Sequence, residues 1–257
     1  MTELLELTTT DMDDSDASIA LVPTGSTEQH GPALPLGTDT FVARDLAEAV
    51  GDHPAVLVGP TIPVGVSPHH RHFDGTLWVN AETFHDYVEE VVRSLASHGL
   101  ERTIFVNGHG GNVNELQRVG QRLRGEGVAY AVCWNWWVAT DELLDALFDT
   151  PGGHAGHGET SMMFEVDPDA VHDDRLDAAQ EDIPPGWGKQ VHGAEVGFDT
   201  IDFTPTGAVG EPTMATAAAG EQIHAEAVAE LEALIEWLAS LSADELYEHA
   251  RPLHPRD

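Results

Sequence analysis

The amino-acid sequence predicts an α/β fold, a three-layer sandwich in which helices flank a mainly parallel central sheet. Short apolar runs alternate with amphipathic helical stretches along the chain, as in parallel sheets covered on both faces. The 257 residues are enough to bury a sizeable core. Because no internal repeat and no low-complexity linker interrupts them, residues 1–257 are expected to form a single domain.

The first elements follow from short apolar runs and from glycine. Residues 18–23 (SIALVP) predict a buried strand, and residues 39–50 predict a helix that ends at Gly51. Residues 55–58 and 61–66 are short strand-like runs broken by glycine and proline.

Residues 81–98 form the clearest helix, since their apolar side chains recur at helical spacing. Asn80 is placed to cap this helix and Gly99 to end it. The side chains expected on its buried face are Phe84, Tyr87, Val88, Val91, Val92 and Leu95.

The later elements continue the alternation. Residues 103–106 predict a strand, 112–124 a helix, and 127–133 a strand that ends at a buried Cys133. Residues 217–241 predict a long amphipathic helix. Its inward side chains are Ile223, Val228, Leu231, Ile235 and Leu238.

The charge of the chain excludes several classes of function. Forty-five acidic residues against 11 basic ones give a formal net charge of −34. Nucleic-acid binding through general charge is excluded, because phosphate contacts need Lys and Arg, and docking on anionic lipid is disfavoured. A surface this acidic, with Lys189 as its single lysine, is typical of a protein that works in molar salt.

Cysteine content and hydropathy indicate the compartment. The single cysteine excludes a disulfide framework and a cysteine-based zinc knuckle. No apolar run reaches the roughly 18 residues of a membrane span, and the N-terminus lacks the basic and apolar regions of a signal peptide. We therefore expect a cytoplasmic protein.

Three segments carry clustered metal-ligand residues. Glu28, His30 and Asp39 follow the strand at 18–23, and His109 follows the strand at 103–106 within NGHGGN. The third segment, HAGHGETS, offers His154, His157 and Glu159. Because ligands bind at the carboxyl ends of parallel strands, the first two loops should open onto the same rim.

This residue chemistry favours a hydrolytic metal centre. Carboxylates and imidazoles together suit Zn, Mn or Fe(II), and a carboxylate such as Asp39 can bridge two ions. Two such ions can hold a shared hydroxide and polarise a carbonyl. Isolated His and Asp residues are usually surface groups, but three ligand-bearing loops at one predicted rim favour the metal interpretation.

Other residues leave alternatives open. His69, His70 and His72 either line a pocket mouth or belong to a polar loop. The tryptophans Trp134, Trp136 and Trp137 form either core or an aromatic lid over a flat substrate, and the lid is favoured. Ser161 lacks a nucleophile-elbow context, and no Walker loop or strand-linked GxGxxG is present, so serine hydrolysis and nucleotide-cofactor chemistry have no support.

Four motifs together resemble the creatininase (creatinine amidohydrolase) family. They are LVPTGSTEQHGPALPLGTDT, FDGT at 73–76, NGHGGN at 107–112 and HAGHGETS at 154–161, within roughly residues 18–220. The resemblance implies an α/β fold with a mainly parallel sheet. It also implies two divalent ions (Zn, Mn or Fe) per subunit, a small-molecule substrate and often a hexamer, so that a homo-oligomer is expected.

The resemblance also implies a role for each matching residue. Glu28 and His109 would bind one ion, His30 would bind the other, and Asp39 would bridge them. His154 would be the proton-transfer histidine that serves the leaving nitrogen. Glu159 matches the acid that follows this histidine by five residues, and it is expected both among the catalytic residues and as a metal ligand.

One position departs from creatininases, which carry a glutamate ligand two residues after the histidine equivalent to His109. This chain has Gly111 there, and its NGHGGN form resembles other branches of the family. That resemblance implies that Glu159 completes the second metal site. Those branches include archaeal deformylases of a formylamino-pyrimidine nucleotide, and a branch that trims a peptide during redox-cofactor maturation. The salt-adapted composition points to a halophilic archaeon and favours the deformylase interpretation.

The expected reaction is hydrolysis of a C–N bond in a creatinine-type cyclic amide or in a formamide. His70, Arg71, Trp136 and Trp137 are expected to bind the substrate. A phosphorylated substrate would need basic partners, for which Arg44, Arg71 and Lys189 are candidates. The alternative is a catalytically retired family member that binds a metabolite or a protein, and the intact His154 argues against it.

Overall fold

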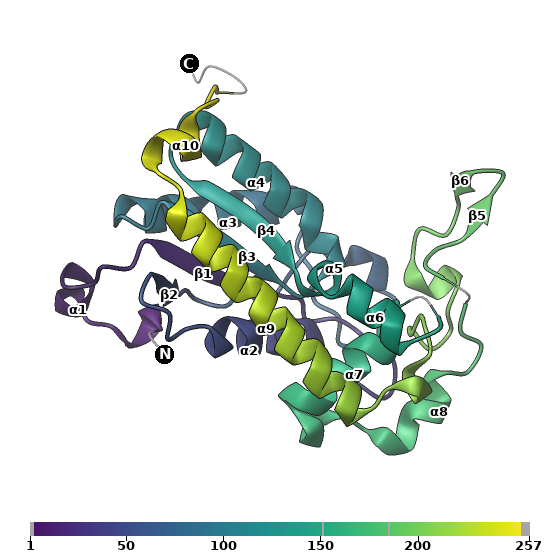
Figure 1. Cartoon of the computed structure of the whole chain (residues 1–257). Coiled ribbons are helices and arrows are strands. Elements are labelled where there is room, and N and C mark those ends of the chain that lie inside the picture. Colours follow the sequence, from purple (N-terminus) through teal and green to yellow (C-terminus); the bar gives the residue numbers. More distant parts are fainter. Residues whose placement is uncertain (1–2, 151, 185, 253–257) are drawn as a thin grey trace.

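A four-stranded parallel sheet forms the centre of the molecule, in the order β2-β1-β3-β4 (Figure 1). The computed structural model describes residues 3–150, 152–184 and 186–252. Its strands are β1 (Ile19–Thr24), β2 (Val56–Val58), β3 (Arg102–Asn107) and β4 (Tyr130–Asn135). The α/β sandwich predicted from the sequence is confirmed.

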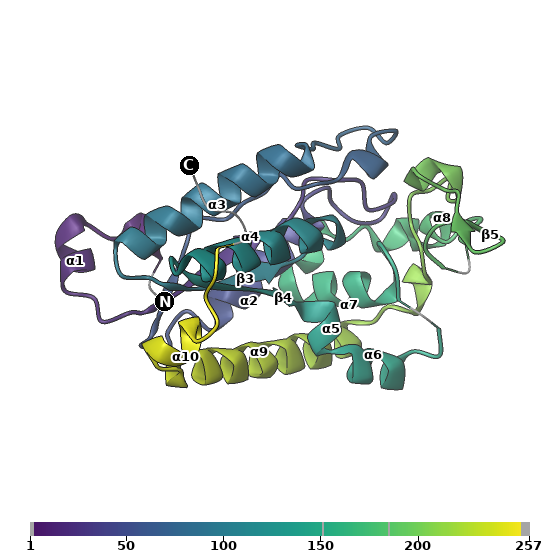
Figure 2. The ribbon, with the colours of Figure 1, turned by 90° about the horizontal axis from the view of Figure 1, so that it is seen from above.

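Helices cover both faces of this sheet (Figure 2). One face packs against α2 (Thr38–Ala49), α7 (His157–Val166) and α9 (Ala217–Ser240), and the other against α3 (Ala81–Ser97) and α4 (Val113–Glu126). Side chains of β1 alternate between the two cores, as its pleat requires: Ile19 and Leu21 enter one, Ala20 and Val22 the other.

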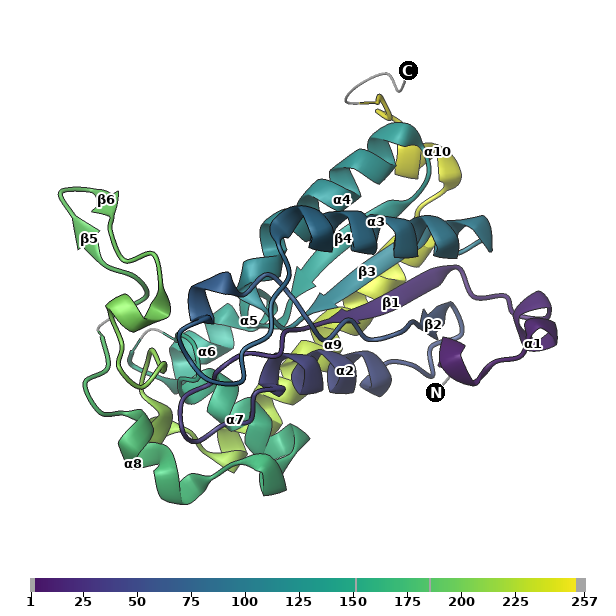
Figure 3. The same ribbon diagram turned by 180° about the vertical axis from the view of Figure 1, so that it is seen from behind.

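Shorter elements complete the described chain. The helices are α1 (Thr9–Asp13), α5 (Trp136–Ala139), α6 (Asp141–Leu147), α8 (Leu176–Ala179) and α10 (Ala243–Tyr247). A two-stranded hairpin, β5 (Gln190–Val191) and β6 (Ala194–Glu195), turns at His192 and Gly193, which both have positive φ. The hairpin stands away from the sheet and helices (Figures 1 and 3).

The register of β1 and β3 positions the candidate site. The two strands pair from Ile19 with Arg102 to Thr24 with Asn107, so they end at the same level. The loops that follow them therefore begin side by side at the carboxyl edge of the sheet, as the strand-end rule predicts.

Two predicted strands need correction. Residues 61–66 form no strand, because only Ile62 bridges to Thr24 and the chain then turns toward Asn112, whose Oδ1 accepts from the Val66 N–H at 3.0 Å. The strand predicted at 127–133 begins at Tyr130, because Gly127 adopts φ +68° and ends α4. Cys133 is half-buried rather than buried, and burial raises the pKa of its thiol to about 12.

Helix α3 also differs in detail from its prediction. Tyr87 is 55% exposed, because the buried face runs through Phe84, Val88 and Val92 and includes His85 instead. Asn80 occupies the N-cap position, but its side chain makes no capping hydrogen bond. Among the residues that the structure describes, no helix combines the length and the hydropathy needed to cross a membrane.

Candidate metal centre

The first four candidate ligands lie in the two loops at the sheet edge. Glu28 and His30 belong to the loop after β1, Asp39 lies in the first turn of α2, and His109 follows β3. All four are buried, with exposed fractions between 0% and 4%. Residues far apart in the sequence therefore meet here because β1 and β3 are neighbours.

These side chains form two groups that share Asp39. In the first, His109 Nδ1 lies 3.1 Å from Glu28 Oε1 and 3.2 Å from Asp39 Oδ2. In the second, His30 Nε2 lies 3.0 Å from Asp39 Oδ1 and 3.7 Å from Glu159 Oε2. One carboxylate oxygen of Asp39 thus faces each group, and Glu159 reaches the second group from the first turn of α7.

The donor atoms of both groups fit divalent cations. Glu28, Asp39 and His109 can offer one ligand atom each within 4.8 Å of one another, and so can two sets that include His154, one with His30 and Glu159 and one with Glu28 and His70. Among the described residues, both carboxylate oxygens of Glu28 and Oδ2 of Asp39 are buried without a hydrogen-bond partner. Burying a carboxylate oxygen that accepts no hydrogen bond is costly, whereas carboxylate oxygen with imidazole nitrogen is a common donor set for zinc and manganese.

The electrostatics of the centre favour added positive charge. Burial alone would lower the pKa of His30, but the Asp39 carboxylate beside it raises that pKa to about 10. Burial likewise opposes charge on His109, and Glu28 outweighs it, so the pKa of His109 lies well above its ordinary value. Since metal ligands must be deprotonated, a bound cation would take the place of these protons.

His154 has a hydrogen bond that orients its ring. Its Nε2 donates to the backbone carbonyl of Gln29 at 2.6 Å, so Nδ1 is the unprotonated nitrogen. That Nδ1 lies 3.7 Å from Glu28 Oε1. Burial, together with the positive charge of His30, lowers the pKa of His154 to about 3, which leaves a neutral ring at the centre.

Glu159 is held by the turn that precedes α7. The Ala155 N–H donates to Glu159 Oε2 at 2.5 Å. Burial raises the pKa of this carboxyl to about 7, against the opposing charge of His30. A cation beside it would favour the ionised carboxylate.

Gln29 connects the loop after β1 to His70 and to Gly207, and sequence reasoning missed it. Its side-chain Nε2 donates to His70 Nδ1 at 2.7 Å and to the Gly207 carbonyl at 3.0 Å. His70 therefore carries its proton on Nε2, which lies 3.3 Å from Glu28 Oε1. The only sequence signal was the position of Gln29 between Glu28 and His30.

A cavity of about 690 Å³ opens from this centre. Trp136, which is buried, and Trp137, which is half-buried, line one wall, and His69 and His70 also line the cavity. Trp134 is buried in the core beside the sheet and does not line it. Of the three tryptophans, Trp134 therefore belongs to the core, and Trp136 and Trp137 belong to the cavity wall.

The basic residues expected to bind a phosphate lie elsewhere. Arg71 does not line the cavity; its guanidinium pairs with both carboxylate oxygens of Asp199, with Nη2 2.6 Å from Oδ2. Arg44 pairs with Glu48, and His72, on the same loop as Arg71, pairs with Asp199. No Lys or Arg is found among the cavity-lining residues of the described chain, whereas Asp141, Asp145 and Glu195 line it.

Gly111 has no room for the glutamate side chain that creatininases carry at this position. A Cβ at Gly111 would lie 2.2 Å from the Val66 carbonyl oxygen and 2.4 Å from His109 Nε2, closer than real Cβ atoms come. A glutamate at this position would therefore displace the backbone or His109. Glu159, reaching in from α7, supplies a carboxylate to His30 instead.

Comparison with known proteins assigns the family. The family model described as "Creatininase: Creatinine amidohydrolase" matches residues 5–235. The chain belongs to the creatininase family. Its members are amidohydrolases that act on C–N bonds.

Relatives in this family carry different activities. The chain is 36% identical over 225 residues to a mycofactocin precursor peptide peptidase of Mycobacterium ulcerans, covering 81% of this chain and 80% of that protein. It is 28% identical over 178 residues to creatinine amidohydrolase of Pseudomonas putida, covering 62% and 68%. It is 25% identical over 152 residues to a 2-amino-5-formylamino-6-ribosylaminopyrimidin-4(3H)-one 5'-monophosphate deformylase of Methanothermus fervidus, covering 58% and 56%.

Solved structures share the fold. A structure titled "Creatininase Mn" superposes with a TM-score of 0.78 at 24% identity, covering 93% of this chain and 99% of that one. A mutant creatininase in a form named Zn-Zn gives a TM-score of 0.79 at 23% identity, covering 93% and 98%. These likenesses support the fold, and the two solved creatininases are a manganese form and a zinc form.

Proposed function

We propose that residues 1–257 act as one domain, a two-metal amidohydrolase that cleaves the amide bond of a peptide-like substrate. The observation that carries the proposal is the pair of ligand groups that share Asp39. They lie beneath a large cavity with aromatic walls, whose described lining residues include no Lys or Arg. The mycofactocin precursor peptide peptidases, 36–38% identical over four fifths of the chain or more, support a peptide substrate.

Each polar side chain then has a defined task. Glu28 and His109 would hold one divalent cation (Zn, Mn or Fe), His30 and Glu159 the other, and Asp39 both. When bound, such a pair supplies a hydroxide nucleophile and polarises the amide carbonyl. The Gln29 carbonyl holds the Nε2–H of His154, which leaves Nδ1 free to accept the proton of the attacking water and then to pass it to the leaving nitrogen.

The cavity disfavours the other two substrate classes. A nucleotide phosphate needs Arg, Lys or free N–H donors, and the lining offers carboxylates in place of Lys and Arg. Creatinine is a single small ring, and it would leave most of a cavity of about 690 Å³ unfilled. A peptide fills it without requiring a phosphate contact.

The test is a comparison of three substrates on one protein sample. Protein loaded with Mn or Zn in molar KCl should hydrolyse short peptides, lose that activity with a chelator, and regain it with metal. Formate release from the formylamino-pyrimidine nucleotide and conversion of creatinine should both be slower by orders of magnitude. Faster turnover of either compound than of any peptide would overturn the substrate assignment.

Two outcomes of the same experiment test further expectations. A folded, metal-loaded sample that hydrolyses none of the three substrates would favour the non-catalytic alternative. Repeating the assay and a stability measurement at low salt tests the salt adaptation expected from the charge of −34. Sedimentation of the same sample tests the expected homo-oligomer.

A further inference from the structure

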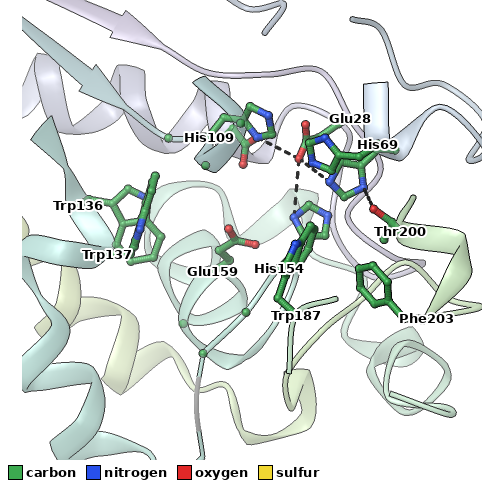
Figure 4. A pocket seen from close by; sticks show the side chains of 18 of the residues that line it. Glu28, His69, His109, Trp136, Trp137, His154, Glu159, Trp187, Thr200 and Phe203 are labelled. Carbon is green, nitrogen blue, oxygen red and sulfur yellow. Dashed lines mark hydrogen bonds and ion pairs between the residues drawn. The ribbon is translucent and has the colours of Figure 1, made fainter. Parts of the chain in front are cut away.

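A second aromatic wall faces Trp136 and Trp137 across the metal centre. It comes from residues 186–203, which include the β5–β6 hairpin and are here called the arm. Trp187, Phe198 and Phe203 of the arm line the cavity. Figure 4 shows Trp187 and Phe203 on the other side of Glu159 from Trp136 and Trp137. Trp187 packs edge-on against Phe203, with ring centroids 5.3 Å apart.

Contacts at its root fix the arm over one side of the centre. Asp199 pairs with Arg71 and with His72 Nε2 at 3.2 Å, and Thr200 Oγ1 lies 3.0 Å from His70 Nδ1. These contacts attach the arm to the loop that carries His70. The ring of Trp187 consequently lies edge-on to His154, with centroids 6.1 Å apart.

The aromatic surface of the arm is not buried by the rest of the described chain. Trp187 is 47% exposed and Phe198 is 78% exposed, although both line the cavity. Apolar surface left open inside a cavity gains free energy when a ligand covers it. Apolar side chains of a molecule in the cavity would cover this surface.

We propose that Trp187, Phe198 and Phe203 form a subsite for an apolar side chain on the amine side of the scissile amide. The side assignment rests on the proposed function, in which His154 protonates the leaving nitrogen. Because Trp187 lies beside His154, the group attached to that nitrogen extends toward the arm. The acyl group then extends toward Trp136 and Trp137, and Figure 4 shows Glu159 between the two walls and His154 beside Trp187.

A binding measurement tests the subsite without any hydrolysis. Metal-loaded protein is titrated with phenylalaninamide and with glycinamide, which represent amine-side products. Covering the aromatic surface should make phenylalaninamide bind about tenfold more tightly. Trp187→Ala should abolish this preference, and Trp187→Phe should keep most of it. Equal binding of both amides to the unmodified protein would overturn the proposal.

Trp237→Ala is the matched control for Trp187→Ala. Trp237 is also 47% exposed, but it lies on α9 against Tyr130 and does not line the cavity. Its removal should leave the preference for phenylalaninamide unchanged. If both variants lose the preference equally, the subsite is refuted, because a general loss of structure then explains the result.

Hydrolysis of matched peptides tests the side assignment. Trp187→Ala should lower kcat/KM about tenfold for acetyl-Gly–Phe-amide at the Gly–Phe bond, with little change at the Phe–Gly bond of acetyl-Phe–Gly-amide. Equal losses on both peptides would overturn the assignment. If no peptide is hydrolysed but the preference for phenylalaninamide persists, the proposed function fails and the subsite remains. Hydrolysis without that preference refutes the subsite alone.

Discussion

The metal centre and the arm border the same cavity but are held in different ways. Glu28, Asp39 and His109 are at least 96% buried; Glu28 and His109 lie on loops that follow the paired strands β1 and β3, and Asp39 lies in the first turn of α2. The arm is attached by a few polar contacts at its root and leaves Phe198 78% exposed. Under the proposed function, the rigid sheet edge would set the chemistry, and the loosely packed arm would select the substrate. Loops on a rigid scaffold commonly divide the work in this way.

The largest effect is expected at Asp39, where the two ligand groups meet. Asp39→Ala removes an oxygen from each group, so both ions and all measurable activity should be lost. Metal content per chain measured by mass spectrometry checks this. Asp45→Asn on the same helix is the control, since Asp45 pairs with His224 far from the centre. Full metal occupancy in Asp39→Ala would refute the shared carboxylate.

His154 should separate catalysis from metal binding. His154→Ala should keep both ions and lower kcat by on the order of 10²–10⁴, the range for a lost general acid. Metal analysis and steady-state kinetics on one preparation give both quantities. An unchanged kcat would remove His154 from the mechanism, and the loss of metal would make it a ligand instead.

Gly207 tests whether Gln29 positions the histidines. Gly207 has φ +87°, and a Cβ there would lie 1.8 Å from Gln29 Oε1. Gly99 has φ +90° with nothing within 4 Å, so an alanine there has comparable backbone strain without the collision. Both alanine variants should lose about 1–3 kcal/mol of unfolding free energy in urea. Only Gly207→Ala should also lower kcat severalfold, and equal activities would mean that Gln29 has no positioning role.

The smallest effect is expected from a pair outside both regions. A hydrogen bond from His224 to Asp45 at 2.7 Å raises the pKa of His224 against partial burial, and Glu165 adds to the effect. A raised folded-state pKa stabilises the protein below the unfolded-state pKa of histidine. This stabilisation is lost as the pH rises through the folded-state value.

Asp45→Asn should therefore lower the urea midpoint slightly near pH 5 and leave it unchanged near pH 9. The effect should shrink in molar salt because the pair is partly exposed. A larger loss at pH 9 than at pH 5 would contradict the assigned sign.

The spacing of apolar residues predicted most of the helices and strands, because such spacing depends only on residues that are close in the sequence. The helix at 81–98 appeared as α3 (Ala81–Ser97), since Phe84, Val88, Val92 and Leu95 repeat at helical spacing. The run at 61–66 failed because only Ile62 bridges to a strand, at Thr24, and the Val66 N–H donates to Asn112 Oδ1 instead of to a sheet partner. Apolar character alone does not distinguish those two uses.

The sequence by itself determined the sheet, the flanking helices and the residues that meet at the strand ends. Helical periodicity and the alignment of parallel strand ends are local or general rules. Only the tertiary structure decided that Arg71 pairs with Asp199, 128 residues away, and that Trp187 lies beside His154. It also decided which nitrogen of His154 carries the proton. Such contacts join segments that are distant in the sequence, and they depend on how these segments pack. The spacing of residues along the chain therefore does not predict them.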